Sequence, residues 1–193
     1  MKHEIEFIED GHIYLVDGVI IPSVTQILKR KFGHKYDFVN RKVLSAAAER
    51  GTAVHKAIEE YCKEGKESDI PELYNFKFLC ERKNIVVKGN EMQIALEDDN
   101  GDVIAAGTLD LLVEVDGQKG IGDIKTTSKL DKEYLAYQLN LYKRGYEQTY
   151  ADHIDFLFGL HLRGDTRRYV DIPVNWDVVK EILNVSESDR DES

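Results

Sequence analysis

The sequence predicts a mixed α/β (α+β) fold, in which helices pack on a central mixed sheet and a β-hairpin lies at the N-terminus. Three patterns support this prediction. Apolar and polar residues alternate near the N-terminus, strand-like runs joined by Asn-Gly and Asp-Gly pairs form a meander in the middle of the chain, and helical patterns precede and follow that meander. Two further strand-like runs near the C-terminus complete the sheet.

The N-terminal segment has the period-2 pattern of a hairpin. Apolar residues alternate with polar ones on both sides of the pair Asp10-Gly11, at Ile5, Phe7, Tyr14 and Val16. A second pair, Asp17-Gly18, turns the chain into a short third strand, which Pro22 ends. We therefore expect a small antiparallel unit before the first helix.

Helical signals follow this unit. Ser23 and Gln26 have the spacing of a capping box, which predicts a short helix directly after Ser23. A helical pattern continues over residues 36–63, where Gly51 is expected to separate two helices. Pro71 suits the first turn of a further helix.

The remaining chain supplies most of the sheet. We expect strands near residues 85–97, 103–115, 119–127, 154–162 and 167–174. A long amphipathic helix over 130–150 separates the third and fourth of these, and a final helix is expected over 176–185. Residues 1–185 are predicted to form a single domain, and the polar tail 186–193 is predicted to be disordered.

The turn pairs also predict which residues face one another across the meander. If Asp116-Gly117 forms a two-residue hairpin turn, the register places Asp110 opposite Asp123 and the favourable couple Glu114 opposite Lys119. A bulge within either strand would break this register.

A second turn of the same kind at Asn100-Gly101 would place Glu91 opposite Asp110. Three acids then line up across three strands, where like charges destabilise the sheet unless a cation neutralises them. Lys125 has the same parity as Asp123 and points to the same face. A metal site beside a lysine is one interpretation, and an exposed sheet face with solvated charges is the other.

Two helical features bear on the metal interpretation. His55 shares one helix face with Gly51 and Glu59, and its imidazole is a possible metal ligand if that helix docks on the acids. Gln138 and Tyr142 are four residues apart on the helix after the third acidic strand, from which they can reach the same place. Each feature is also compatible with ordinary packing or exposure.

Basic residues gather in two stretches. The first interleaves cations with aromatic residues: Lys29, Arg30, Lys31, Phe32, Lys35, Tyr36, Phe38, Arg41 and Lys42. The second contains Arg163, Arg167 and Arg168. Such residues can grip a phosphate backbone and stack on bases, although a solvated helix face explains the first stretch equally well.

Composition limits the function classes. The net charge of −10, from 36 acids and 26 bases in 193 residues, argues against broad charge-driven binding of nucleic acid but allows a local basic groove. Cys62 and Cys80 are too few for a disulfide scaffold and are expected to be buried thiols in a reducing, cytoplasmic compartment. We expect no membrane span and no signal peptide. The P-loop, dinucleotide-binding and serine-nucleophile motifs are absent.

Taken together, these residues resemble the PD-(D/E)xK nuclease superfamily, in particular its RecB-like or phage-type exonuclease branch. The matching elements span residues 50–142 in the order of the family: Gly51-x-x-x-His55, Glu91, Gly107-Thr-Leu-Asp110, Asp123-Ile-Lys125-Thr126 and Gln138-x-x-x-Tyr142. The resemblance implies a restriction-endonuclease-like core. The N-terminal hairpin followed by Ser23 is similar to phage-type members that process DNA ends.

The resemblance also implies a ligand set for the metal. Asp110 and Asp123 would bind the ion, and His55 and the Ile124 carbonyl would complete its coordination. Oxygen ligands suit Mg²⁺ or Mn²⁺, either of which activates water and neutralises charge on a phosphodiester.

Four other residues receive roles from the same resemblance. Lys125 would orient or help deprotonate the attacking water and stabilise the phosphate charge. Glu91 would support a second metal or anchor the water network, and Gln138 and Tyr142 would contact substrate or brace the site. Two departures exist: Leu109 replaces the proline of the superfamily name, and the cysteines for the iron–sulfur cluster of some relatives are missing.

The sequence therefore predicts a Mg²⁺- or Mn²⁺-dependent DNA exonuclease of phage or mobile-element type, acting on single- or double-stranded DNA ends in recombination. A single-strand annealing recombinase and further copies of the chain are possible partners. Two alternatives stay open, an endonuclease or structure-specific nuclease with the same site, and a catalytically silent DNA-binding module.

Overall fold

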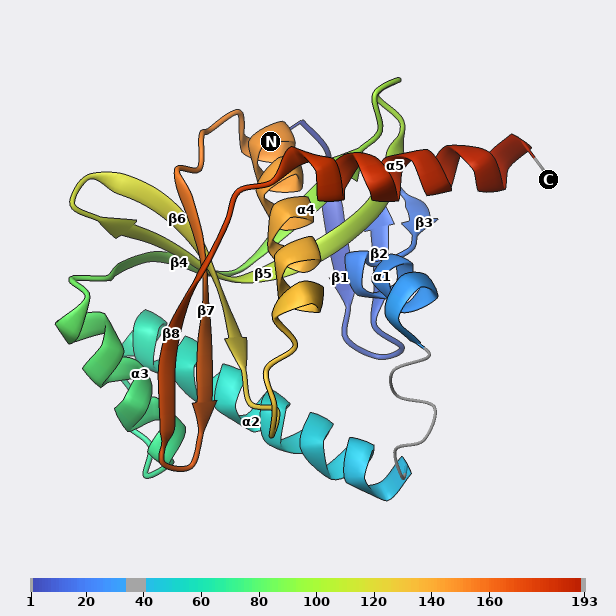
Figure 1. The fold of residues 1–193 in the computed structure, drawn as a ribbon. Helices are drawn as coiled ribbons and strands as arrows, with labels where there is room; N and C mark the ends of the chain where they lie inside the picture. Colours follow the sequence, from blue (N-terminus) through green and yellow to red (C-terminus); the bar gives the residue numbers. More distant parts are fainter. Residues whose placement is uncertain (1, 34–40, 192–193) are drawn as a thin grey trace.

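A five-stranded mixed sheet forms the centre of the protein (Figure 1). The computed structural model describes residues 2–33 and 41–191, with the side chains of 41–44 and 185–191 left out. The strands lie side by side in chain order: β4 (Val86–Glu97), β5 (Val103–Val115), β6 (Gln118–Lys125), β7 (Phe156–Arg163) and β8 (Thr166–Ile172). Only the β6–β7 pair is parallel. This confirms the predicted mixed α/β fold.

The N-terminal unit is also confirmed. Three antiparallel strands form a second sheet: β1 (Ile5–Ile8), β2 (Ile13–Val16) and β3 (Val19–Ile21). Tyr14 and Val16 pack on Ala95 and Ala106 of the central sheet. Helix α1 (Val24–Phe32) then begins with the predicted capping box, in which Ser23 and Gln26 bond each other's backbone amides.

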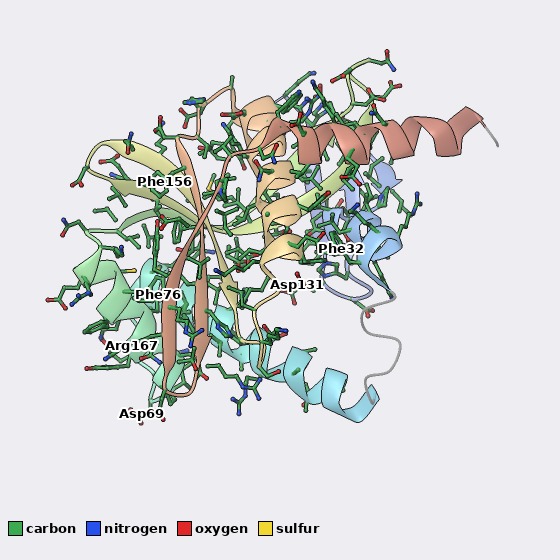
Figure 2. The ribbon with its side chains drawn as sticks, viewed as in Figure 1. Phe32, Asp69, Phe76, Asp131, Phe156 and Arg167 are labelled. Atoms are coloured by element: carbon green, nitrogen blue, oxygen red, sulfur yellow. The ribbon has the colours of Figure 1, made fainter. Side chains whose placement is uncertain are left out.

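Helices cover both faces of the central sheet (Figure 1). One apolar cluster joins α1, α4 (Lys132–Tyr150) and α5 (Trp176–Asp191) to one face, and a second joins α2 (Arg41–Glu64) and α3 (Pro71–Arg82) to the other. Phe32 belongs to the first cluster and Phe76 to the second, and both are labelled in Figure 2. Among the described helices we find none with a stretch long and apolar enough to cross a bilayer.

The register between β5 and β6 is the predicted one. Val115 pairs with Gln118, Glu114 with Lys119, and the ladder continues to Leu111 and Gly122. The residues next along the two strands are Asp110 and Asp123. Asp116 and Gly117 both have positive φ, as a two-residue hairpin turn of this type requires.

The turn between β4 and β5 differs from the prediction, although the register beyond it does not. The Asp98 amide donates to the Asp102 carbonyl, so the turn is one residue longer than expected. An irregularity next to Glu97 then shifts the pairing by one residue. Asn90 pairs with Leu111 and Met92 with Leu109, which leaves Glu91 and Asp110 between them. The two deviations cancel, and the predicted opposition of Glu91 and Asp110 is kept.

One prediction about the helices is wrong, and another helix is longer than expected. Gly51 does not separate two helices but lies inside the continuous helix α2. Helix α5 continues to Asp191, beyond the expected end at residue 185, and residues 192–193 lie outside the described residues. Disorder of the tail 186–193 stays a prediction. Extending an existing helix by polar residues costs little once the helix has been nucleated by its apolar first turns.

Candidate metal centre

Three potential metal ligands meet where α2 crosses the strands β4 and β5. His55 Nδ1 lies 3.4 Å from Asp110 Oδ1 and 3.7 Å from Glu91 Oε1. The possible ligand atoms of the three residues all lie within 4.8 Å of one another. One imidazole and two carboxylates are a donor set that suits a divalent ion with oxygen and nitrogen ligands.

Helix α2 brings His55 to the strands by a close approach at Gly51. A Cβ atom at Gly51 would lie 3.4 Å from Thr126 Oγ1, directly after β6. One turn further on, His55 Nε2 lies 3.0 Å from the Ile124 carbonyl oxygen. A carbonyl can only accept, so Nε2 carries the proton in this hydrogen bond. This fixes the ring and directs Nδ1 to the carboxylates of Asp110 and Glu91.

The Nδ1 atom therefore needs a cation. If the ring were neutral, its Nδ1 lone pair would face two carboxylates with no positive charge between them. Burial lowers the pKa of His55, but the carboxylates of Asp110 and Glu91 outweigh burial and raise it to about 11. Burial raises the pKa of Asp110, whereas the charged His55 outweighs it and brings that pKa below its ordinary value. Either a proton or a metal ion on His55 Nδ1 offsets the negative charge of the two carboxylates.

We therefore expect the binding of Mn²⁺ to release a proton. Because the pKa of His55 is raised, the stabilisation that its charge gives the fold is complete below pH 6.5 and is lost as the pH rises through about 11. At pH 7.5 a metal on Nδ1 must displace that proton, so affinity should increase about tenfold per pH unit. Titration calorimetry in buffers of different ionisation enthalpy measures the release, and His55→Gln is the control. An enthalpy that is independent of the buffer contradicts this prediction.

A second cluster adjoins the three ligands. Asp123 is buried, and the Lys125 ammonium lies 2.6 Å from its Oδ2 as an ion pair without hydrogen-bond geometry. Lys125 Nζ donates to Gln138 Oε1 at 2.9 Å, and Gln138 Nε2 donates to the Tyr142 hydroxyl at 3.2 Å. Helix α4 thus holds the lysine from above the sheet. The predicted grouping of Lys125 with Asp123, Gln138 and Tyr142 is what the structure has.

Charge explains the state of this second cluster. Burial raises the pKa of Asp123 to about 6. The negative charge of Asp110 adds to this upward shift, and Lys125 opposes it without cancelling it. Burial lowers the pKa of Lys125, but Asp123 and Asp110 outweigh burial and raise it above its ordinary value. Lys125 is therefore held as the ammonium form.

The three clustered residues, His55, Glu91 and Asp110, are not the same as the predicted metal ligands. Glu91, expected to play a supporting role, stands beside His55 and Asp110, whereas Asp123 faces Lys125. The Ile124 carbonyl accepts from His55, and the Ile124 amide donates to Asp110 Oδ2 at 2.6 Å. Coordination by Asp123 and by the Ile124 carbonyl stays a prediction.

Glu91 occupies a strained backbone position. Its φ is 49° in the middle of β4, a region that costs a non-glycine residue about 1–3 kcal/mol. Such strain persists only where the surroundings hold it, and it is frequent at functional sites. The conformation supports a role for Glu91 in the site rather than in the sheet alone.

Sequence reasoning missed Tyr14. It is buried, and its hydroxyl lies 2.8 Å from Thr108 Oγ1 on β5. Burial is the main cause of its raised pKa, and the charges of Glu91 and Asp110 add to it. The N-terminal hairpin therefore contributes a hydroxyl close to the acids. Period-2 alternation predicted only that Tyr14 would lie in a strand of the N-terminal hairpin.

The basic stretches take several roles in the structure. Phe32 is buried and packs against Tyr134 and Tyr137, so it cannot stack on bases. Lys31 forms an ion pair with Glu181. Among the other residues of the first stretch, structural description is lacking for Lys35, Tyr36 and Phe38 and for the side chains of Arg41 and Lys42.

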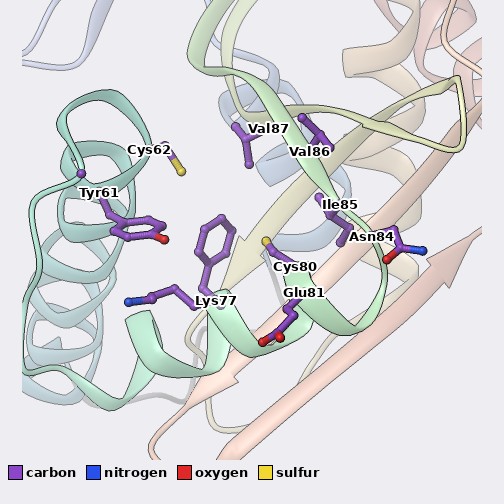
Figure 3. Close-up of a pocket in the computed structure, with 11 residues that line it drawn as sticks. Tyr61, Cys62, Lys77, Cys80, Glu81, Asn84, Ile85, Val86 and Val87 are labelled. Atoms are coloured by element: carbon purple, nitrogen blue, oxygen red, sulfur yellow. The ribbon is translucent and has the colours of Figure 1, made fainter.

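The two cysteines line a pocket of about 810 Å³ between α2, α3 and the start of β4 (Figure 3). Tyr61, Lys77 and Val87 line it too. Burial raises the pKa of Cys62, and it raises the pKa of Cys80 to about 12. Both thiols are thus half-buried and protonated at neutral pH, in agreement with a structural role.

We expect Cys80 to resist alkylation in the folded protein. With a pKa of about 12, its thiolate fraction at pH 8 is smaller than that of an unfolded cysteine by roughly a thousandfold. Iodoacetamide labelling followed by peptide mass spectrometry measures the rate, with the urea-unfolded protein as control. Equal rates in the folded and unfolded protein would contradict the buried environment.

Comparison with known proteins assigns no family to the chain. No family model matches the sequence, and no curated protein matches it. Among solved structures, one described as "Crystal structure of SSO0001" is 15% identical with a TM-score of 0.45, and the match covers 83% of this chain and 68% of that one.

Proposed function

We propose that the protein is a metal-dependent deoxyribonuclease that hydrolyses phosphodiester bonds at DNA ends. The observation that carries the proposal is the His55 ring, whose Nδ1 faces the carboxylates of Asp110 and Glu91 while Nε2 is bonded to the Ile124 carbonyl. This arrangement fits a divalent ion. A partly buried ammonium beside it, at Lys125, fits an anionic substrate.

The residues present would hold Mg²⁺ or Mn²⁺ through the Asp110 carboxylate and His55 Nδ1, with Glu91 and Asp123 next to them. When bound, the ion would lower the pKa of water and offset negative charge on the scissile phosphate. Hydrogen bonds from the Ile124 amide to Asp110 and from His55 to the Ile124 carbonyl keep both side chains in place. Binding of the ion would therefore require little reorganisation of these ligands.

Lys125 would act as a charged donor rather than as a base. Its raised pKa keeps the ammonium protonated, and Gln138 Oε1 and Asp123 Oδ2 position it. A fixed positive charge in a buried site stabilises negative charge that develops on phosphate oxygens. Tyr142, which accepts from Gln138, would brace this arrangement rather than contact the reacting atoms.

The choice of DNA ends as the substrate comes from the resemblance to RecB-like and phage-type exonucleases. The net charge of −10 means that affinity must come from a few local cations and from the metal. Action during phage or mobile-element recombination, next to a single-strand annealing recombinase or in a ring of several copies, belongs to the same proposal.

Digestion of end-labelled linear DNA tests the proposal. Duplex and single-stranded substrates are incubated with Mn²⁺ or Mg²⁺, with EDTA, and with a covalently closed circle in parallel. Release of label that needs both a metal and a free end supports the exonuclease, and its polarity follows from the labelled end. Cleavage of the closed circle would replace the exonuclease with an endonuclease. No cleavage of any substrate by folded, metal-bound protein would leave the silent DNA-binding module.

A further inference from the structure

A second pocket, of about 770 Å³, lies beside the candidate metal centre. It is lined by the loop that follows β6 and by one face of β7 and β8, including Lys129, Lys132, His161 and Arg168. His161 pairs with Lys125 across β6 and β7, and with Arg168 across β7 and β8. Adjacent strands lie about 4.8 Å apart, so the pocket begins one strand from the lysine of the site.

Positive charge dominates the lining of this pocket. Lys129, Lys132 and Arg168 are exposed, and no carboxylate in the described part of the chain lies within ion-pair distance of any of them. Asp171 is the one acidic residue among the described lining residues. In a chain with a net charge of −10, a concave patch of this kind is unusual and favours an anionic ligand.

His161 gives the pocket a buried polar group. Its Nε2 lies 2.7 Å from the Thr127 carbonyl and, since a carbonyl only accepts, carries the proton. Its Nδ1 is buried and has no hydrogen-bond partner among the described residues. With Nε2 carrying the proton, Nδ1 has the lone pair that can accept a hydrogen bond from the hydroxyl of a phosphate monoester.

The loop that closes the pocket is fixed from the sheet. Arg163 Nη1 donates to the Thr126 carbonyl at 3.2 Å, and His161 holds the next carbonyl, that of Thr127. Thr127 Oγ1 donates to the Lys129 carbonyl at 2.9 Å. Backbone anchoring of this kind places Lys129 without using its side chain, which stays available for a ligand.

We infer that this pocket binds a phosphate group. The source of this phosphate rests on the proposed nuclease function. In such a nuclease, the pocket would hold either a phosphate of the DNA strand near the scissile bond or the phosphate of the released mononucleotide. Binding itself does not depend on catalysis, because the pocket shares no ligand residue with the His55 cluster.

Binding in the presence of EDTA tests the inference without metal or cleavage. The probes are inorganic phosphate, a deoxynucleoside 5′-monophosphate, and a single-stranded oligonucleotide with or without a terminal phosphate. The variants are the surface double substitution Lys129→Ala with Arg168→Ala, and His161→Gln, whose amide can keep the Thr127 bond. Lys88→Ala is the control, because Lys88 pairs with Glu114 at the start of β4, the edge strand of the sheet opposite to β8.

We expect the double variant to bind phosphate-containing probes at least tenfold more weakly, His161→Gln to bind them several-fold more weakly, and Lys88→Ala to bind like the parent. A mononucleotide that binds as tightly as the oligonucleotide identifies the product as the ligand. Preference for the phosphorylated oligonucleotide identifies the strand. Absence of binding by the parent, or equal affinity in the double variant, overturns the inference. Phosphate binding without Mn²⁺-dependent cleavage would instead reject only the nuclease.

Discussion

Replacement of Lys125 by alanine is expected to reduce DNA cleavage by about 10²–10⁴-fold, the usual contribution of one positioned catalytic group. The ammonium is the one cation that contacts Asp123, at 2.6 Å, among the residues the structure describes. Without the Lys125 ammonium, the negative charge that develops on the scissile phosphate loses its nearest fixed positive group. Single-turnover cleavage of end-labelled DNA at saturating Mn²⁺ measures the loss.

Two variants separate charge from other effects of this substitution. Lys125→Arg keeps a positive charge but has a guanidinium that does not deprotonate, so partial activity would agree with a charged donor. Full inactivity of Lys125→Arg with intact folding and metal binding would favour a lysine that acts as a base. Lys88→Ala removes a lysine from an exposed ion pair and should leave cleavage unchanged. Wild-type activity in Lys125→Ala would contradict the proposed site.

Replacement of Asp110 by asparagine is expected to abolish stabilisation by Mn²⁺. An asparagine oxygen can still accept from the Ile124 amide, which Asp110 Oδ2 does at 2.6 Å, so the fold should persist. At a metal concentration of 100 times Kd, binding stabilises the folded protein by about 2.7 kcal/mol, which is about 5–10 °C in Tm for a chain of this size. We expect this shift in the parent and not in Asp110→Asn.

The matched control for this variant is Asp116→Asn in the turn between β5 and β6. Asp116 has a φ of 50°, a conformation that asparagine also adopts, and an Asn-Gly pair preserves the turn. Asp116→Asn thus removes one carboxylate charge, as Asp110→Asn does, but at a position outside the cluster of His55, Glu91 and Asp110. A Mn²⁺ shift that survives in Asp110→Asn, or that disappears in Asp116→Asn, would show that the ion binds elsewhere.

The strand register was predictable where local turn chemistry decides it. Asp116 and Gly117 both adopt positive φ, and their hairpin aligns β5 and β6 as the residue pair indicates. Of the described pair Asn100-Gly101, only Gly101 has a positive φ, because Asp98 Oδ1 accepts from the Asn100 and Asp102 amides and draws in a longer turn. Side-chain capping of this kind competes with the two-residue turn, and residue pairs alone do not reveal which wins.

The helix docking that completes the site lay beyond local patterns. Gly51 is a weak helix former, which suggested a break, but it lies inside α2 where the helix passes Thr126 and delivers His55 to the Ile124 carbonyl. Tertiary packing here outweighs propensity. The positive φ of Glu91 and the approach of Tyr14 likewise depend on neighbours far away in sequence. Parity along β6, by contrast, was enough to place Lys125 beside Asp123.

Anomalous diffraction from crystals soaked in Mn²⁺ tests most directly whether the acidic cluster is a metal centre. We predict a single strong peak, or a pair of peaks, within bonding distance of His55 Nδ1 and the Asp110 carboxylate, with the His55 Nε2 bond to the Ile124 carbonyl kept. A saturating soak that leaves this position without a peak, while His55 remains paired only with Asp110 and Glu91, would contradict the metal centre and the nuclease built on it.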